Sequence, residues 1–69
     1  MKKLEVMLNG NLEKIAEEIK LSTFLLSKGL NIDTIIVEYQ GKIVKKEEWA
    51  TITLQDKDCL EVLKFVGGG

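Results

Sequence analysis

The 69-residue chain is 45% hydrophobic and 30% charged, with a formal net charge of −1 and both signs mixed along its length. A chain of this size forms one domain at most and leaves little material for an internal catalytic pocket. The composition is typical of a folded globular domain, and the lack of a basic block argues against nucleic-acid binding. No apolar run in the sequence is long enough to span a membrane, so we expect neither nucleic-acid nor membrane partners.

The chain contains no histidine and one cysteine, Cys59. No zinc-ligand spacing exists, so we expect no metal site, and neither Cys59 nor Ser22 has a histidine to act as its base. We interpret Cys59 as a structural residue at the start of a strand; a role in sulfur relay is the alternative. A lone cysteine cannot form an internal disulfide and the N-terminus has no apolar signal core, which together favour a cytoplasmic protein.

The chain opens with a predicted strand over residues 2–8, which alternates apolar and polar side chains in part. Asn9-Gly10 follows, and this dipeptide is the strongest short signal for a hairpin turn. The next apolar residues recur with helical spacing, at Leu12, Ile15, Ala16 and Ile19. Periodicity therefore favours a helix, whereas the hairpin turn favours a strand over residues 11–16, and we expect the strand.

A helix is predicted next, over residues 22–28. Its shared face consists of Leu21, Phe24, Leu25 and Lys28. We expect Ser22 to be the N-cap residue, because a serine hydroxyl accepts from the first free backbone N–H groups. Gly29 is expected to take the left-handed conformation that commonly ends a helix.

Residues 34–39 are rich in β-branched side chains and predict a buried strand. Gln40-Gly41 would turn this strand, and residues 42–44 would pair back against it. The middle of the chain therefore predicts a second hairpin.

Residues 45–49 are compatible with one helical turn, in which we interpret Trp49 as an anchor that packs a loop onto the sheet. Residues 59–66 predict a last, strongly apolar strand that lies centrally, beside the first. The resulting order predicts an α+β protein of the β-grasp (ubiquitin-like) class: a mixed four- to five-stranded sheet packed on one helix. We expect a single domain over residues 1–66, followed by a flexible glycine tail over residues 67–69.

The ending Gly67-Gly68-Gly69 directly follows the apolar strand. A frayed end or a remnant of cloning would also look like this. A glycine run has a specific use, however, because a backbone without Cβ atoms can thread a narrow enzyme channel and approach a nucleotide closely. The unhindered carboxylate of Gly69 could then attack the α-phosphate of ATP.

Four stretches resemble the ubiquitin-like sulfur carriers of thiamine biosynthesis, the ThiS-type family. They are Leu4 to Gly10, Gly41 to Trp49 with its Glu48-Trp49 ending, Asp56-Lys57-Asp58, and Phe65 to Gly69. The resemblance covers nearly the whole chain, and its most specific parts are the Trp49 segment and the tail. The chain departs from the family at Lys45, where proline is frequent, at Lys57, where glycine is usual, and over residues 11–20.

The resemblance implies a protein co-substrate rather than an enzyme. A ThiF-type adenylating enzyme would use Mg-ATP to convert the Gly69 carboxylate to an acyl-adenylate; the carrier itself would bind no cofactor. Sulfur from a cysteine desulfurase, delivered as a persulfide, would displace AMP. The Gly69 thiocarboxylate would then donate sulfur to a ThiG-type thiazole synthase. Gly67 and Gly68 would provide reach through the partner's channel, and Phe65 and Val66 are expected at the docking surface.

Two other functions remain compatible with the sequence. The first is a sulfur carrier for molybdopterin or another cofactor pathway, which would use Gly69 in the same way but deliver to a different acceptor. The second is a ubiquitin-like modifier or binding module. A toxin–antitoxin or regulatory domain with an incidental glycine tail is a weaker third. The short length and the Glu48-Trp49 segment favour thiamine biosynthesis.

Overall fold

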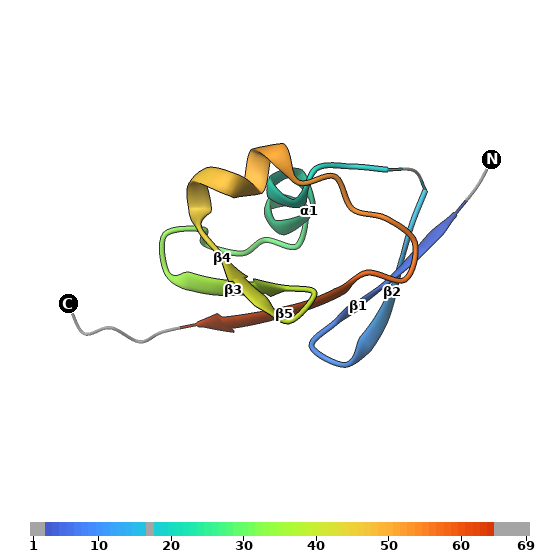
Figure 1. Ribbon diagram of the computed structural model, residues 1–69, viewed down its shortest axis with the longest axis horizontal. Helices are drawn as coiled ribbons and strands as arrows, with labels where there is room; N and C mark the ends of the chain where they lie inside the picture. The colour runs from blue at the N-terminus through green and yellow to red at the C-terminus, as the bar shows by residue number, and fades with distance from the viewer. Residues whose placement is uncertain (1–2, 17, 65–69) are drawn as a thin grey trace.

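The computed structural model describes residues 3–16 and 18–64. The elements are β1 (Leu4–Leu8), β2 (Asn11–Ile15), α1 (Leu21–Ser27), β3 (Ile35–Tyr39), β4 (Lys42–Val44), the 3-10 helix η1 (Lys46–Thr51) and β5 (Cys59–Lys64). They build a five-stranded sheet in the order β2-β1-β5-β3-β4 (Figure 1). β1 and β5 run parallel, and the other neighbours are antiparallel. The expected central position of the last strand, beside the first, is confirmed.

The first hairpin decides the ambiguity of residues 11–20 in favour of a strand. β2 pairs with β1 along its whole length, from Leu8 opposite Asn11 to Leu4 opposite Ile15. Asn9 and Gly10 both have positive φ, at 51° and 83°. Such a two-residue turn matches the right-handed twist of the strands that it joins. The helical spacing of the apolar residues here was therefore misleading, and the turn chemistry was the better signal.

The helix α1 begins at Leu21, so the prediction of Ser22 as its N-cap is wrong. The cap position is Lys20, which makes no capping hydrogen bond with its side chain. Instead, the backbone N–H of Leu21 donates to the carbonyl of Ile52 at 2.8 Å, and Lys20 forms a β-bridge with Thr53. A backbone carbonyl from a distant segment thus satisfies the first N–H of the helix.

The end of α1 follows the prediction. Gly29 has φ 75°. Its N–H donates to Leu26 O at 3.0 Å, and the Leu30 N–H donates to Leu25 O at 3.4 Å. This is the paired hydrogen-bond pattern of a Schellman motif, which requires a left-handed residue where glycine stands.

α1 and η1 lie on the same side of the sheet (Figure 1). The core lies between them and the sheet and consists of Val6, Leu21, Phe24, Leu25, Ile35, Val37, Trp49, Leu54, Leu60 and Val62. Trp49 is 3% exposed, and its indole Nε1–H donates to Val44 O at 3.2 Å. Its interpretation as a packing anchor is confirmed. Lys28, expected to share the helical face of the apolar residues of α1, is exposed.

The segment from the β3–β4 turn to η1 is held by its turn geometry and by local hydrogen bonds. Gln40 and Gly41 turn the second hairpin with φ 53° and 83°. Glu48 caps η1, because its carboxylate accepts from the Lys45 N–H and its own N–H donates to Lys45 O, each at 2.8 Å. Helix η1 runs over six residues, longer than the single turn expected.

Within the described ranges, neither helix approaches the length and apolar character of a membrane span.

Candidate functional site

The sequence-predicted site lies outside the described residues. This holds for Gly67, Gly68 and Gly69 and for the expected docking residues Phe65 and Val66. The structure describes the strand that leads into this segment, β5, up to Lys64. The contacts that hold β5 in place therefore also determine where the chain enters the predicted site.

β5 is fixed most extensively on its β3 side. The pairing there extends from Tyr39 opposite Leu60 to Ile35 opposite Lys64. On the other side, β1 pairs only through Met7 with Cys59 and through Leu8 with Leu60. β1 ends there, so the second half of β5 is paired with β3 on one edge but not with β1 on the other.

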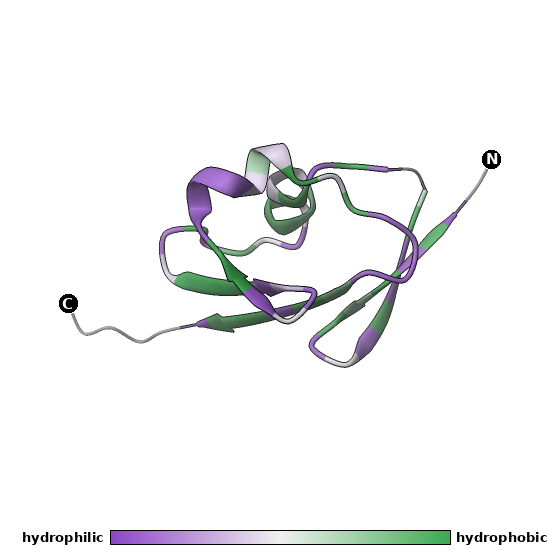
Figure 2. Cartoon of the chain, in the orientation of Figure 1, coloured by the Kyte–Doolittle hydropathy of each residue, from purple (hydrophilic) through white to green (hydrophobic). Residues whose placement is uncertain are grey.

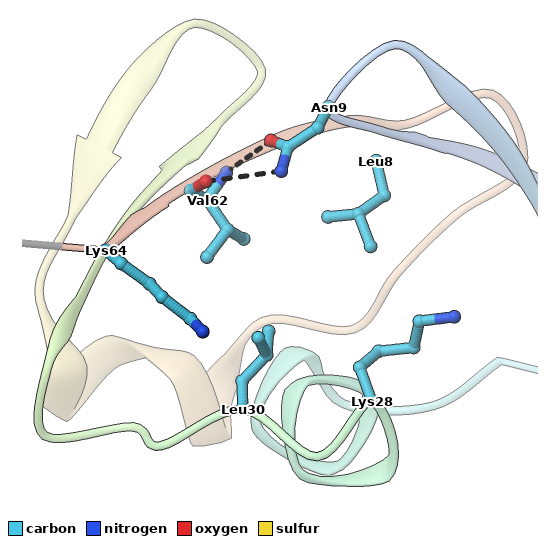
Figure 3. Close-up of a pocket in the computed structure, with 6 residues that line it drawn as sticks. All are labelled: Leu8, Asn9, Lys28, Leu30, Val62 and Lys64. Carbon is cyan, nitrogen blue, oxygen red and sulfur yellow. Dashed lines mark hydrogen bonds between the residues drawn. The ribbon is translucent and has the colours of Figure 1, made fainter.

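Two side-chain amides complete the edges of β5. The Asn9 amide bridges the backbone of Val62: its Oδ1 accepts from the Val62 N–H at 2.7 Å, and its Nδ2 donates to Val62 O at 3.2 Å (Figure 3). On the opposite edge, Gln40 Oε1 accepts from the Cys59 N–H at 2.6 Å. Both are the first residues of hairpin turns, so each turn also holds the central strand.

A buried carboxylate organises the turn that precedes β5. Asp58 is 5% exposed, and its Oδ2 accepts from Tyr39 Oη and from the Gln55 N–H, each at 2.7 Å. Burial, the hydrogen bond to Asp58 and the charge of that carboxylate raise the pKa of Tyr39 from 10.0 to about 12. The hydrogen bond that Tyr39 donates to Asp58 ties β3 to the start of β5, and the raised pKa extends this contact to more alkaline pH.

Lys57 occupies a strained position in the same turn. Its φ is 71°, a left-handed value that a lysine seldom adopts. Its N–H donates to Glu5 O at 2.6 Å, and Asp56 Oδ1 accepts from the Glu5 N–H at 2.8 Å. Glycine would adopt this conformation without a Cβ clash, which gives a backbone reason for the glycine expected here from the resemblance.

Alternate side chains of β5 point to opposite faces of the sheet, one buried and the other exposed. Leu60 and Val62 point into the core, whereas Leu63 is 54% exposed on the opposite face. Ile36 lies directly opposite Leu63, and Ile43 of β4 lies on the same face; they are 37% and 69% exposed. We call Ile36, Ile43 and Leu63 the outer patch. Figure 2 shows hydrophobic residues along β3 and β5 in this region of the sheet.

Two carboxylates adjoin the outer patch. Glu38 and Glu61 are directly opposite each other in the β3–β5 ladder, on the face that carries Leu63. Like charges in directly opposed positions repel each other and destabilise a sheet. A cationic side chain from a partner would relieve this repulsion.

The described residues offer no conventional catalytic constellation. No group of three or more His, Cys, Asp or Glu side chains within them could hold a metal ion. Cys59 begins β5, as expected, but it is exposed rather than packed into the core. Sequence reasoning did not find the outer patch, because the adjacent apolar pair Val62-Leu63 hides which residue faces inward. The pairing partners of β5 were the missing information.

A family model, a curated relative and a solved structure all match this chain to ThiS proteins. A model of the ThiS family matches residues 6–69. The sulfur carrier protein ThiS of Bacillus subtilis is 37% identical to this chain over 49 residues, which cover 71% of this chain and 74% of the relative. The crystal structure of a thiamine biosynthesis protein, ThiS, from Geobacter metallireducens superposes with a TM-score of 0.84 at 26% identity. That alignment covers 96% of this chain and 100% of the other, and it confirms the predicted β-grasp fold.

Two thiazole synthases contain a segment similar to this chain. The proteins from Paramagnetospirillum magneticum and Magnetococcus marinus are each 27% identical to it over 66 residues. The aligned region is 96% of this chain and 20% of each synthase, so the chain spans about a fifth of the length of these relatives.

Proposed function

The chain belongs to the ThiS family, and on this basis we propose that it is a sulfur carrier of thiamine biosynthesis, a co-substrate of other enzymes. The observation that carries the proposal is the extent of the family match, which runs from residue 6 through the glycine ending to Gly69. The 37% identity to a Bacillus subtilis protein named as a sulfur carrier supports it.

The proposed chemistry takes place at the carboxylate of Gly69. A carboxylate oxygen attacks the α-phosphate of ATP in an adenylating enzyme; pyrophosphate leaves, and an acyl-adenylate forms. A sulfide equivalent from a cysteine desulfurase then displaces AMP and leaves a thiocarboxylate. When the donor is a persulfide, a thiol must afterwards reduce the acyl disulfide. The carrier supplies the acyl group, and Gly67 and Gly68 allow the backbone to enter the partner's channel.

Thiazole synthase is the proposed acceptor of the sulfur. The two synthase relatives carry a segment similar to nearly this whole chain within their own polypeptide. Linking two modules in one chain raises the effective concentration of one at the other, which benefits partners that must meet. We infer that the present chain meets a separate thiazole synthase in the same functional relationship.

The outer patch is the proposed docking surface for these partners. Its three apolar side chains are exposed on the sheet, and Leu63 lies on the strand that leads into Phe65 and Val66. Apolar side chains contribute to binding when a partner covers them. The carboxylates of Glu38 and Glu61 suggest that the partner presents a lysine or arginine beside its apolar surface.

Intact-mass spectrometry tests the proposal. The protein is incubated with the cognate adenylating enzyme, ATP and a sulfide source, and we expect a gain of roughly 16 Da as oxygen is replaced by sulfur in an activated carboxyl group. Fragmentation should place the gain on Gly69. A variant lacking Gly68 and Gly69 is the control and should gain no mass. An unchanged mass in the full chain, or a gain on Cys59, would overturn the proposal.

A further inference from the structure

A groove of about 340 Å³ lies on the inner side of the sheet, beside the second half of β5. Its lining consists of Leu8, Asn9, Lys28, Leu30, Val62 and Lys64 (Figure 3). The groove is thus on the face opposite the outer patch, and the docking surface proposed above does not include it. Its lining contains three aliphatic side chains and two ammonium groups but no carboxylate.

Within the described part of the chain, the backbone of Lys64 lies on a strand edge of β5 that β1 does not reach, next to this groove. Because Gln40 N–H donates to Cys59 O, the hydrogen-bonded pairs of the β3–β5 ladder are those at Cys59, Glu61 and Leu63. The N–H and C=O of Val62 and Lys64 therefore point to the other edge. The Asn9 amide takes both groups of Val62. The N–H and C=O of Lys64 are next along that edge, beyond the described pairing of β1 with β5, which ends at Leu8 opposite Leu60.

The charge at the groove is positive. Lys28 Nζ pairs with Glu13 at 2.7 Å, and that carboxylate is the one acidic group in contact with either lysine within the described ranges. Lys64 takes part in no ion pair there. In Figure 3 the ammonium group of Lys64 points toward the Leu30 side of the groove, with Lys28 on the other side of Leu30. A carboxylate entering this groove would meet the Lys64 ammonium group and, beside it, Lys28 with its Glu13 partner, above an apolar floor.

We propose that this groove binds an extended acidic segment of a partner protein. The segment adds to the sheet by pairing with the N–H and C=O of Lys64, as a short strand beside β5. Alternate side chains of an added strand point to the same face. One apolar side chain covers Leu30 and Val62, and a neighbouring carboxylate on that face lies between Lys28 and Lys64. The proposal does not depend on sulfur transfer at Gly69.

Titration of the ¹⁵N-labelled full chain, followed by NMR, tests the proposal. The probe is a capped pentapeptide that alternates leucine or valine with aspartate and glutamate; the control replaces the acidic residues with lysine. We expect saturable shifts of the Leu30, Val62 and Lys64 amides with the acidic peptide alone. Hydrogen exchange of the Lys64 amide should slow at the same time, because that N–H becomes a donor in the new ladder.

Matched charge reversals complete the test. Lys64→Glu should weaken binding of the acidic peptide by about tenfold, whereas Lys42→Glu, an exposed lysine outside the groove, should change it less than about twofold. Absence of shifts at millimolar peptide would overturn the proposal. So would shifts confined to the outer patch, equal binding of the lysine peptide, or an equal effect of the two substitutions. Each result can be obtained without thiocarboxylate formation, so failure here is separate from failure of the sulfur-carrier function.

Discussion

The two faces of β5 use the same kind of residue for different purposes. Leu60 is 2% exposed and belongs to the core, whereas Leu63, three positions later, is 54% exposed. Leu60 is surrounded by the side chains that hold α1 on the sheet, but Leu63 and its neighbour Ile36 face away from the core. Leu60 therefore contributes to folding, whereas Leu63 lies in the proposed docking surface. The proposed docking role of Leu63 would thus separate recognition from stability within one strand.

Truncation of the two leucines gives the largest expected contrast. Leu60→Ala should lower the free energy of unfolding by about 3 kcal/mol, because it removes buried methyl groups and leaves a cavity. Leu63→Ala should lower it by less than about 1 kcal/mol, since the side chain is already half in water. Urea unfolding of both variants measures the difference. Equal losses would mean that the two leucines do not differ in their contribution to the free energy of unfolding.

The two side-chain amides that hold β5 should differ in strength. Asn9→Ala removes two hydrogen bonds to Val62 and should cost about 2 kcal/mol. Gln40→Ala removes one exposed bond to Cys59 at nearly the same φ and should cost about 1 kcal/mol. Because both residues have nearly the same positive φ, alanine introduces a similar backbone strain in each variant, and the difference between the two variants is free of it. A larger loss for Gln40→Ala, measured by urea unfolding, would contradict the bridging role of Asn9.

The Tyr39–Asp58 contact predicts a loss of stability in alkali. The pKa of Tyr39 is raised to about 12 in the folded state from an ordinary 10.0. The folded state holds this proton more tightly, so the contribution is complete below the unfolded pKa of 10.0 and is lost as the pH rises through about 12. Tyr39→Phe lacks the group and should show no such component. The difference in urea midpoint between the two proteins should shrink across that pH window; a constant difference would refute the prediction.

Relief of backbone strain at Lys57 gives the smallest expected effect, and it should raise rather than lower the free energy of unfolding. Lys57→Gly should raise the free energy of unfolding by about 1 kcal/mol, because glycine adopts the observed φ of 71° without a Cβ clash. The matched control is Lys42→Gly in strand β4, where glycine should destabilise instead. Thermal unfolding measures both. A destabilised Lys57→Gly variant would show that the turn gains more from its lysine than it loses to strain.

The parts of the fold that depend on local chemistry could be predicted from the sequence. Asn9-Gly10 and Gln40-Gly41 required two-residue turns, and β-branched residues indicated β3. Gly29 marked the end of α1 because its left-handed conformation is a local requirement.

The failures have a common cause in contacts between distant segments. The start of α1 is fixed by Ile52 O, which no pattern near Ser22 reveals. The inward direction of Val62 rather than Leu63 follows from strand pairing, and two adjacent apolar residues carry no parity signal. Asn9 was explained as a turn residue, so its bridge to Val62 had no separate sequence signature. The tail was predicted from its glycines, the β-grasp pattern and the family resemblance, and its role remains a prediction.

The rate of thiocarboxylate formation in Leu63→Ala tests the central claim most directly. The variant and the unaltered protein are incubated with the adenylating enzyme, ATP and a sulfide source, and the gain of roughly 16 Da is followed by intact mass over time. We predict that Leu63→Ala, although folded, reacts at least about fivefold more slowly at subsaturating concentration, because a docking contact is lost. An unchanged rate in the folded variant would contradict the assignment of the outer face to partner recognition.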